Sequence, residues 1–346
     1  MIVSKVDPLC PVFGKCGGCL YQDIPYTEEL RIKEAYLKEL LHPILGSSES
    51  AYEPIVASPK EYHYRHQLDL RIERFKNQEI DMGFSSPQRR GRLIPVEKCF
   101  IAAQEIFNFL PQLKREASAC FSSKYRQGNL VVRSGQDNVV RWGGLGQGSL
   151  SLEPKDYFWV EILGKKIHYS LDTFFQANLS ILSRLIERIR GFDFWGENVV
   201  LYDLYGGVGF FGISLYDKAG KVVLIEGSKS STQLAEFNVS QLRLTRFEVI
   251  RGLVEEKLSG ELLQENSGTK VAVIDPPRAG LSSRAKDLLM KENVLKHILY
   301  LSCNPEALCE DLGDFVRNGW KIEKVIPYDF FPKTKHLETL VALKSR

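Results

Sequence analysis

The chain has 346 residues, 44% hydrophobic and 26% charged, which is enough to bury a large core that we expect to be divided between two domains. Its formal net charge of +3 is too small to identify a polyanionic partner. Charged and cysteine residues interrupt every short apolar stretch in the first thirty residues, and no apolar run is long enough to span a membrane. These features exclude a membrane protein and predict a globular protein of the cytoplasm.

The cysteines are the first chemical clue. An odd number of cysteines, seven, in a chain without an export signal argues against a disulfide framework. Such thiols are metal ligands, nucleophiles or small buried groups. They lie at Cys10, Cys16, Cys19, Cys99, Cys120, Cys303 and Cys309.

The first half of the chain has the pattern of an α+β domain. Residues 26–45 place apolar side chains at helical intervals and predict one amphipathic helix, begun by Thr27 with Glu29 nearby, that can pack on the second domain. Residues 62–72 and 130–142 are rich in aromatic and branched side chains with partial alternation, and they predict antiparallel strands.

The second half has the pattern of a Rossmann-like α/β domain. A helix predicted at residues 180–190 is followed by further helices alternating with apolar strands. These strands are predicted at 198–205, 221–227, 271–277 and 297–303. Buried strands alternating with helices indicate a mostly parallel, doubly wound sheet. We therefore place the domain boundary between residues 1–170 and 171–346.

A glycine-rich turn follows the first strand of this sheet. The strand ends in Asp203 and runs into Gly206, Gly207 and Gly209, which lets a ligand approach the backbone closely. A NAD-binding dehydrogenase has a similar turn, so the turn alone does not identify the cofactor. Glu226 ends the next strand, where a carboxylate can accept hydrogen bonds from ribose hydroxyls. A surface acid on a Rossmann-like sheet is the alternative.

A second strand end carries Asp275, two prolines and Arg278. The prolines remove two N–H donors, so the strand must stop and turn at the sheet edge where ligands of this fold bind. An acid followed by two prolines is common at this edge in base-modifying methyltransferases. Arg278 can meet a phosphate or a carboxylate, or lie exposed without a partner.

Cys303 ends a third strand at the same edge, in the segment Ser-Cys-Asn-Pro. A cysteine thiolate is the natural nucleophile for addition to C6 of a pyrimidine, because it attacks readily and leaves again cleanly. Addition at C6 makes C5 electron-rich enough to accept a methyl group. A cysteine at a strand end is more often a small core residue, but the nearby Asp275 motif favours the nucleophile, whereas Cys309 is expected in the core.

This chemistry also needs a base that removes the C5 proton and so expels the thiol. Glu338 lies just before the apolar segment Leu-Val-Ala-Leu, where burial would raise its pKa toward the range of a general base. His336 is the competing candidate.

Together these segments resemble the RNA 5-methyluridine methyltransferase family, whose members modify uridines of 23S ribosomal RNA and of the tRNA T-loop. The matching segments, in the family's order, are CPVFGKCGGCLYQ, DTFFQAN, DLYGGVGFFG, LIEGS, IDPPRAGL, LSCNP and FPKTKHLETL. The resemblance covers nearly the whole chain and implies a class I methyltransferase domain that uses S-adenosylmethionine. It implies cofactor contacts at Gln176, Tyr205, Glu226 and Asp275, a nucleophile at Cys303 and a proton acceptor at Glu338.

The chain departs from the family at two places. Gly206 and Phe210 stand where many members have cysteine and asparagine in the glycine turn, so a side-chain contact to the cofactor at Phe210 is lost or replaced by backbone groups. Many members also begin with a β-barrel RNA-binding module, the TRAM domain, whereas nine residues precede Cys10 here. The RNA is then expected to be held by the remaining surface.

Three cysteines have the spacing C-x5-C-x2-C, at Cys10, Cys16 and Cys19, and Cys99 is a fourth. Four thiolates suit either tetrahedral zinc or an iron–sulfur cluster. The paired C-x2-C hairpins typical of structural zinc are missing, and the resemblance implies a 4Fe-4S cluster held by these four residues. Its expected role is structural.

Basic and aromatic residues recur in the first half of the chain and suit the binding of RNA loops, since arginines hold phosphates and aromatic rings stack on bases. They are Tyr62, Tyr64, Arg65, Arg71, Arg74, Gln88, Arg89, Arg90 and Arg92. A solvated charged face would have the same pattern.

The predicted function is methylation of uridine C5 in RNA, with ribosomal RNA preferred over transfer RNA, by a monomer. Three alternatives stay open: a tRNA T-loop uridine methyltransferase, an RNA cytosine-C5 methyltransferase, and a non-catalytic iron–sulfur protein that binds RNA. The intact Cys303, Asp275 and Glu338 argue against the last.

Overall fold

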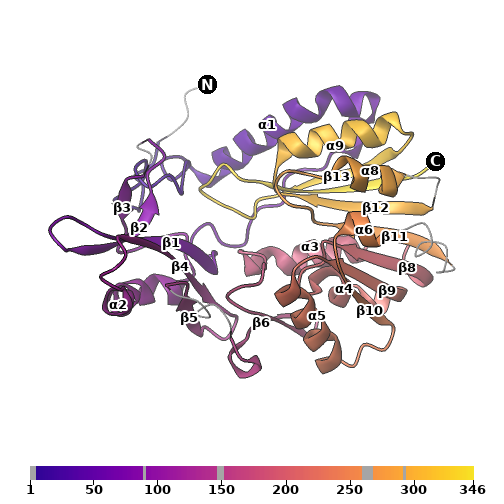
Figure 1. The fold of residues 1–346 in the computed structure, drawn as a ribbon. Coiled ribbons are helices and arrows are strands. Elements are labelled where there is room, and N and C mark those ends of the chain that lie inside the picture. The colour runs from indigo at the N-terminus through magenta and orange to yellow at the C-terminus, as the bar shows by residue number, and fades with distance from the viewer. Residues whose placement is uncertain (1–4, 89–90, 146–151, 259–267, 291–293) are drawn as a thin grey trace.

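The computed structural model of the protein describes residues 5–88, 91–145, 152–258, 268–290 and 294–346. Their strands form a five-stranded sheet, a seven-stranded sheet and a two-stranded hairpin. The two larger sheets lie beside each other, and helix α1 (Tyr26–Leu45) lies along the seven-stranded sheet next to α9 (Pro305–Arg317) (Figure 1).

The seven-stranded sheet confirms the predicted mostly parallel α/β architecture. Its strands are β8 (Gly196–Leu204), β9 (Ala219–Glu226), β10 (Phe247–Arg251), β11 (Thr269–Ile274), β12 (Leu295–Ser302), β13 (Lys321–Tyr328) and β14 (Glu338–Lys344). They are ordered β10-β9-β8-β11-β12-β14-β13, and the pairs from β10 to β12 are parallel. β14 is antiparallel to both of its neighbours. The first residue of β14 therefore lies at the same edge as the last residues of the parallel strands.

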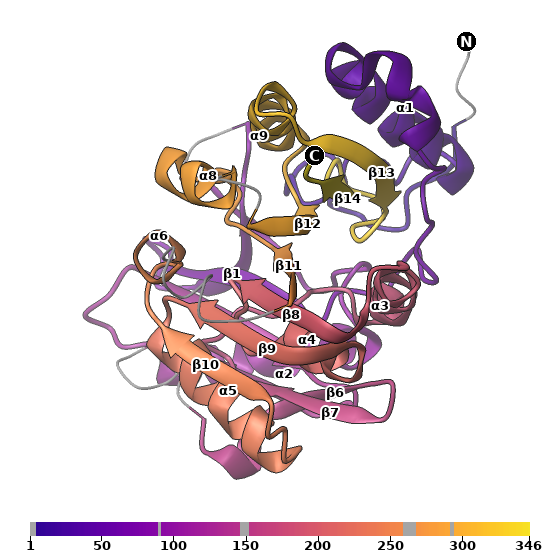
Figure 2. The ribbon, with the colours of Figure 1, turned by 90° about the vertical axis from the view of Figure 1, so that its right-hand side faces the viewer.

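Helices cover both faces of this sheet, because alternate residues of its strands point to opposite sides. Val199 and Leu201 of β8 belong to one hydrophobic cluster, and Val200 and Tyr202 to another. The first cluster includes residues of α3 (Leu182–Arg190), α4 (Phe210–Ser214), α5 (Lys229–Gln241) and the hairpin β6 (Phe158–Ile162) and β7 (Lys165–Tyr169). The second includes residues of α1, α6 (Val254–Lys257), α8 (Ser283–Met290) and α9 (Figure 2).

The five-stranded sheet is antiparallel throughout, in the order β3-β2-β1-β4-β5. Its strands are β1 (Gln67–Arg74), β2 (Ile80–Ser85), β3 (Leu93–Pro95), β4 (Gln127–Ser134) and β5 (Val140–Gly143). Helix α2 (Gln104–Cys120) packs on one face, where Ile106, Leu110 and Leu113 meet Leu68 and Leu130.

The strands predicted in this region are right in kind but wrong in their bounds. The strand expected at residues 62–72 begins only at Gln67, because His63 has a φ of 52° that is incompatible with an extended chain. In residues 130–142, where turn-forming residues and antiparallel strands are expected, the chain forms β4 and β5, joined by a turn that contains Asn138 at a φ of 62°.

Helix α1 confirms the predicted amphipathic helix. Leu37, Leu41 and Leu45 are buried against the seven-stranded sheet. The expected start is wrong, because Pro25 precedes the helix and no side chain caps it. Glu29 is instead fully buried on the same helix face.

The hairpin β6–β7 precedes residue 171 but contributes Val160 and Ile167 to the core of the seven-stranded sheet. The division of the chain into two domains at residues 170 and 171 stays a prediction. None of the described helices is both long and apolar enough to cross a membrane.

Candidate active site

A cavity of about 630 Å³ lies along the carboxyl edge of the seven-stranded sheet, beside the point where the strand order reverses between β8 and β11. Ligands of doubly wound folds bind at this point. The cavity brings together all six residues predicted to bind the cofactor or to react. They are Gln176, Tyr205, Glu226, Asp275, Cys303 and Glu338.

The parallel strands explain why three of these residues meet. Glu226 is the last residue of β9, Tyr205 follows β8, and Asp275 follows β11. β8 pairs with both other strands up to its last residue, Leu204, so the three strand ends lie side by side.

The glycine turn after β8 is shaped by close contacts. A Cβ atom on Gly206 would lie 2.6 Å from Cγ of Leu224, and Gly209 has a φ of 91° at the start of α4. Asp203 is buried, and its Oδ2 accepts a hydrogen bond of 2.7 Å from the N–H of Gly212. Asp203 thus stabilises the turn through this buried hydrogen bond and does not line the cavity.

The Glu226 carboxylate faces this turn. Its Oε2 accepts a hydrogen bond of 3.0 Å from the N–H of Gly207, and its Oε1 accepts one of 2.6 Å from the N–H of Ser228. Each carboxylate oxygen has a further lone pair, so the fixed carboxylate can still accept hydrogen bonds from a ribose.

Phe210, one of the two departures from the family pattern, points into the core. It is 5% exposed, and its ring packs edge-on against Phe175 and Phe211 at centroid distances of 5.7 and 4.8 Å. This part of the turn therefore offers a ligand an apolar surface and backbone groups.

Gln176 and Asp275 form a polar pair in the cavity. The Gln176 amide nitrogen donates to Oδ2 of Asp275 at 3.1 Å. Burial raises the pKa of Asp275 to about 7, and the hydrogen bond from Gln176 opposes this shift. The loop that carries Gln176 is held by the buried Arg133, which donates to the backbone carbonyl of Thr173 at 2.8 Å.

Cys303 and Glu338 are neighbours across β12 and β14. Ser302 pairs with Thr339 in the antiparallel ladder, so Cys303 and Glu338 are the next opposed residues toward the sheet edge. Glu338 is 4% exposed, and its Oε2 has no hydrogen-bond partner among the described residues. Burial, with the nearby Asp275, raises the pKa of Glu338 well above its ordinary value. A buried carboxylate of this kind readily takes up a proton.

The Cys303 thiol also lies in an acidic, half-buried setting. Its pKa is raised to about 11, first by burial and then by Glu338 and Asp275, while a hydrogen bond and the positive charge of Arg278 lower it. Arg278 is thus the group in the cavity that favours the thiolate.

We expect Arg278→Met to raise the pKa of the Cys303 thiol, because the variant loses a cation that stabilises the thiolate. Glu338→Gln should shift this pKa in the opposite direction, because it removes a negative charge. The rate of iodoacetamide alkylation of the Cys303 peptide, measured by mass spectrometry against pH, gives both shifts. Identical titrations in wild type and both variants would contradict the predicted electrostatics.

His336, the competing base, does not line this cavity. It lies in a neighbouring cavity with the four predicted cysteine ligands. Burial, with Arg278 and Lys335, lowers the pKa of His336 to about 4, so it is neutral near pH 7. The geometry therefore favours Glu338.

The neighbouring cavity, of about 260 Å³, brings Cys10, Cys16, Cys19 and Cys99 together. Burial raises the pKa of Cys19 to about 12; a hydrogen bond from Gln22 opposes this shift, whereas the three other thiols add to it. Gln22 also orders the loop, because its Oε1 accepts a hydrogen bond of 3.1 Å from the Cys10 N–H.

The described residues contain no group of three or more His, Cys, Asp and Glu side chains placed to hold a single metal ion. An iron–sulfur cluster is larger than one ion, and its thiolate ligands surround the cluster rather than a single point. Backbone N–H groups of Ile101 and Ala102 point at the Cys99 sulfur, and those of Val12 and Phe13 at Cys10. Such hydrogen bonds to sulfur stabilise thiolates, so they are compatible with a cluster held by these residues.

Several residues predicted to bind RNA are engaged within the protein. Tyr64 is 0% exposed and cannot stack on a base, so that prediction is wrong. Arg71 donates to Glu73 at 2.6 Å, and the Arg74 guanidinium lies 5.5 Å from the centre of the Phe121 ring.

Arg65 is the predicted RNA contact that reaches the active site, since it lines both the active-site cavity and the cysteine cavity. Tyr62 is half-buried under Lys333, and Gln88 donates to the backbone carbonyl of Gly14 at 2.7 Å. Arg92 is exposed, and residues 89–90 lie outside the described part of the chain.

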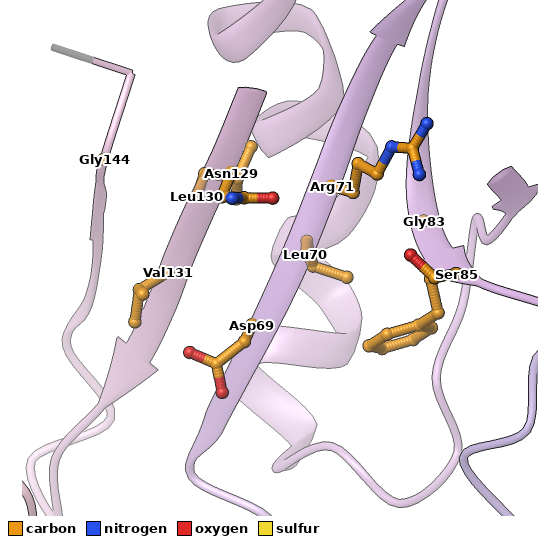
Figure 3. A pocket seen from close by; sticks show the side chains of 10 residues that line it. Asp69, Leu70, Arg71, Gly83, Ser85, Asn129, Leu130, Val131 and Gly144 are labelled. Carbon is orange, nitrogen blue, oxygen red and sulfur yellow. The ribbon is translucent and has the colours of Figure 1, made fainter. Parts of the chain in front are cut away.

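A third cavity, of about 280 Å³, lies on the five-stranded sheet and is lined from β1, β2 and β4 (Figure 3). Its polar side chains include Asp69, Arg71 and Asn129. Asp69 lines this cavity, the cysteine cavity and the active-site cavity. The three cavities are therefore neighbours along one side of the molecule.

The strand order and the cavity at its reversal point define a class I methyltransferase. The solved structure of Pyrococcus abyssi tRNA (uracil-54, C5)-methyltransferase in complex with S-adenosyl-L-homocysteine has the same fold. The similarity has a TM-score of 0.71 and 21% sequence identity, and it covers 94% of this chain and 85% of that chain.

The chain belongs to the tRNA (uracil-5-)-methyltransferase family, whose model matches residues 154–346. A relative described as an uncharacterized RNA methyltransferase of Clostridium tetani is 29% identical, over 99% of this chain and 85% of that protein. The 23S rRNA (uracil(1939)-C(5))-methyltransferase RlmD of Aliivibrio fischeri is 27% identical, over 97% of this chain and 82% of that protein. The chain is thus an S-adenosylmethionine-dependent RNA uracil-C5 methyltransferase, as its motifs predicted.

Proposed function

We propose that this enzyme methylates C5 of a uridine in 23S ribosomal RNA through a covalent bond between the Cys303 sulfur and C6 of the base. The observation that carries the proposal is the opposed placement of Cys303, directly after β12, and Glu338, the first residue of β14, in one cavity with the predicted cofactor contacts.

The chemistry requires the two side chains in turn. The Cys303 thiolate adds to C6, and the electron pair of the C5–C6 double bond moves to C5 and the O4 enolate. C5 takes the methyl group that S-adenosylmethionine supplies. Glu338 then removes the proton from C5, the C5–C6 double bond re-forms, and the C6–S bond breaks to release Cys303. The buried carboxylate of Glu338 is suited to hold that proton.

The cofactor is proposed to contact Gln176, Tyr205, Glu226 and Asp275. Glu226 supports this most directly, because its carboxylate is fixed at the end of β9, where doubly wound folds bind a ribose. Tyr205 follows β8 in a left-handed conformation with a φ of 58° and lines the same cavity as Gly207 and Asp275.

We expect Glu226→Gln to weaken S-adenosylmethionine binding by about 10- to 100-fold, since hydrogen bonds to a charged acceptor contribute about 1.5–3 kcal/mol. The amide would also direct an NH₂ group at one of the two backbone N–H donors. Calorimetric titration with S-adenosyl-L-homocysteine measures the effect. Glu236→Gln, on an exposed turn of α5, is the matched control, and equal affinities of the two variants would argue against a ribose contact.

The preference for ribosomal RNA rests on the similarity to RlmD and on the cysteine set. A tRNA T-loop uridine is the second candidate, favoured by the fold shared with the Pyrococcus abyssi enzyme. Mass spectrometry of ribosomal and transfer RNA from a deletion strain, with and without the restored gene, identifies the target. Loss of 5-methyluridine from transfer RNA alone would overturn the ribosomal assignment. We place the reaction in the cytoplasm and expect a monomer.

Labelled cofactor with 5-fluorouridine RNA tests the reaction itself. Fluorine at C5 cannot leave as a proton does, so a uridine methyltransferase of this mechanism should form a stable, labelled RNA adduct that Cys303→Ala abolishes. Label on cytosine in unmodified RNA would indicate a cytosine-C5 methyltransferase. RNA binding without any labelling would indicate a non-catalytic RNA-binding protein.

We further propose that Cys10, Cys16, Cys19 and Cys99 hold a 4Fe-4S cluster that orders the surface around the active site. We expect the protein purified without oxygen to contain iron and sulfide, and Cys19→Ser to lose both. Cys120→Ser is the control, because Cys120 is exposed at the end of α2. Zinc in place of iron in the native protein would contradict the cluster.

A further inference from the structure

A short segment before Glu338, residues 330–333, is held by hydrogen bonds from several other parts of the chain. The carbonyl of Phe330 accepts from the Asn178 amide at 3.0 Å, and that of Phe331 accepts from Lys33 Nζ at 3.1 Å. The carbonyl of Pro332 accepts from the Tyr64 hydroxyl at 2.9 Å. The carbonyl of Lys333 accepts from the N–H groups of Leu20 and Tyr21, in the cysteine loop, at 2.8 and 3.1 Å. We call residues 330–333 the strap.

Two buried charges of α1 secure the strap. Lys33 Nζ donates to Glu29 Oε1 and to Asp329 Oδ1, both at 2.7 Å. Glu29 Oε1 in turn accepts from the backbone N–H of Lys333 at 2.6 Å. Lys33 is 3% exposed, and Glu29 and Asp329 are 0% exposed. One cation of α1 thus binds both the carboxylate before the strap and a carbonyl within it.

Stability alone gives little reason to bury these charges. Desolvation of an ion pair offsets much of its attraction, and apolar residues of similar volume are often at least as stabilising. Glu29 and Lys33 occupy the same helix face as the buried Leu37, Leu41 and Leu45. What they provide is a defined position for a segment that includes Lys333 at a φ of 66°, a conformation that persists only when its surroundings impose it.

Four residues connect the strap to Glu338. Thr334 turns the chain back, because its hydroxyl donates to the Phe331 carbonyl at 2.8 Å and accepts from the His336 N–H at 3.2 Å. Glu338 then begins β14 opposite Cys303. We infer that Lys33 and Glu29 are positioning residues: through the strap they set where the Glu338 carboxylate stands relative to the base. This inference rests on the proposed role of Glu338 as proton acceptor.

The test separates proton removal from the earlier steps. We expect Lys33→Met to slow the release of methylated RNA from the covalent adduct by about 10- to 100-fold, because a displacement of about 1 Å can cost that much in rate. Affinity for S-adenosyl-L-homocysteine should match wild type, since Lys33 does not line the active-site cavity. Rapid-quench reactions with uridine RNA, resolved on denaturing gels, measure adduct formation and decay. Lys38→Met, at an exposed site of the same helix, is the matched control.

A second variant separates position from folding. Lys33→Met removes the Lys33 cation from both Asp329 and Glu29, and only Glu29 keeps a second cation, the Lys333 ammonium at 3.7 Å, so the variant should unfold at a lower temperature than wild type. Lys33→Met with Asp329→Asn removes the unpaired charge of Asp329 and should recover stability. Adduct decay should stay slow, because the strap still lacks the hydrogen bond from Lys33 of α1 to the Phe331 carbonyl, which keeps only its local bonds from Thr334. Adduct decay at the wild-type rate in this double variant would overturn the inference.

Glu338→Gln, measured in parallel, separates the proposed role of Glu338 as proton acceptor from the inferred positioning role of Lys33 and Glu29. If Glu338→Gln releases RNA normally, the proposed role of Glu338 is wrong. If Glu338→Gln stalls but both Lys33 variants release RNA at the wild-type rate, the inference on Lys33 and Glu29 fails alone.

Discussion

Cys303→Ala is expected to abolish methylation, with a loss in kcat/KM of at least about 10⁴-fold, because the uracil ring then has no group to activate C5. The variant should still bind S-adenosyl-L-homocysteine, since the predicted cofactor contacts are on other strands. Transfer of labelled methyl groups to RNA measures the loss, and calorimetry measures the retained binding.

Cys309→Ala provides the matched control for this substitution. Cys309 is the neighbouring thiol on α9 and packs against the hydrophobic cluster between α1, α9 and the sheet, as the sequence predicted for a core cysteine. A small change in stability with full activity is expected. Comparable activity of the two variants would mean that the nucleophile lies elsewhere.

Glu338→Gln is expected to lower turnover by about 10²- to 10⁴-fold, the usual contribution of a general base. The loss should fall after methyl transfer, because the amide cannot take the C5 proton and the bond to Cys303 cannot break. The variant should therefore accumulate a covalent complex with unmodified uridine RNA, which wild type should resolve quickly. Denaturing electrophoresis with labelled RNA detects this complex.

Two further measurements sharpen this result. His336→Gln should show no such accumulation, since His336 lies in the cysteine cavity. The double variant Glu338→Gln/Cys303→Ala should form no adduct. This result would show that the complex accumulated by Glu338→Gln is bound through Cys303, so that the slow step of Glu338→Gln follows addition of the thiol. A Glu338→Gln enzyme that turns over normally would transfer the role of base to another group.

The position of the candidate site could be predicted from the ends of the strands. An acid, a thiol or a proline pair directly after a buried strand must lie at one edge of a parallel sheet, so Glu226, Asp275 and Cys303 were brought together by topology alone. The antiparallel direction of β14 completes the set, because it brings its first residue, Glu338, to that same edge.

What the sequence could not reveal depends on contacts between distant segments. Tyr64 is an aromatic residue in a basic segment, but its hydroxyl bonds to the strap, far along the chain, so its burial is invisible in local composition. Glu29 and Lys33 have the spacing of an exposed ion pair on a helix, yet they lie on the same helix face as three buried leucines. The sequence did contain one indication that Glu29 and Lys33 are buried, because they are the two charged residues on a helix face that is otherwise apolar.

The direct pairing of β12 with β14 has a consequence for how the reaction begins. The proposed nucleophile, Cys303, and the proposed proton acceptor, Glu338, are opposed residues at the end of one antiparallel ladder, so the pairing of β12 with β14 fixes their separation. The free energy needed at encounter is then mainly that of unstacking the uridine, which is smallest for a base already outside a helix. If the proposed roles hold, we expect this preassembled pair to favour a uridine that leaves its stack easily.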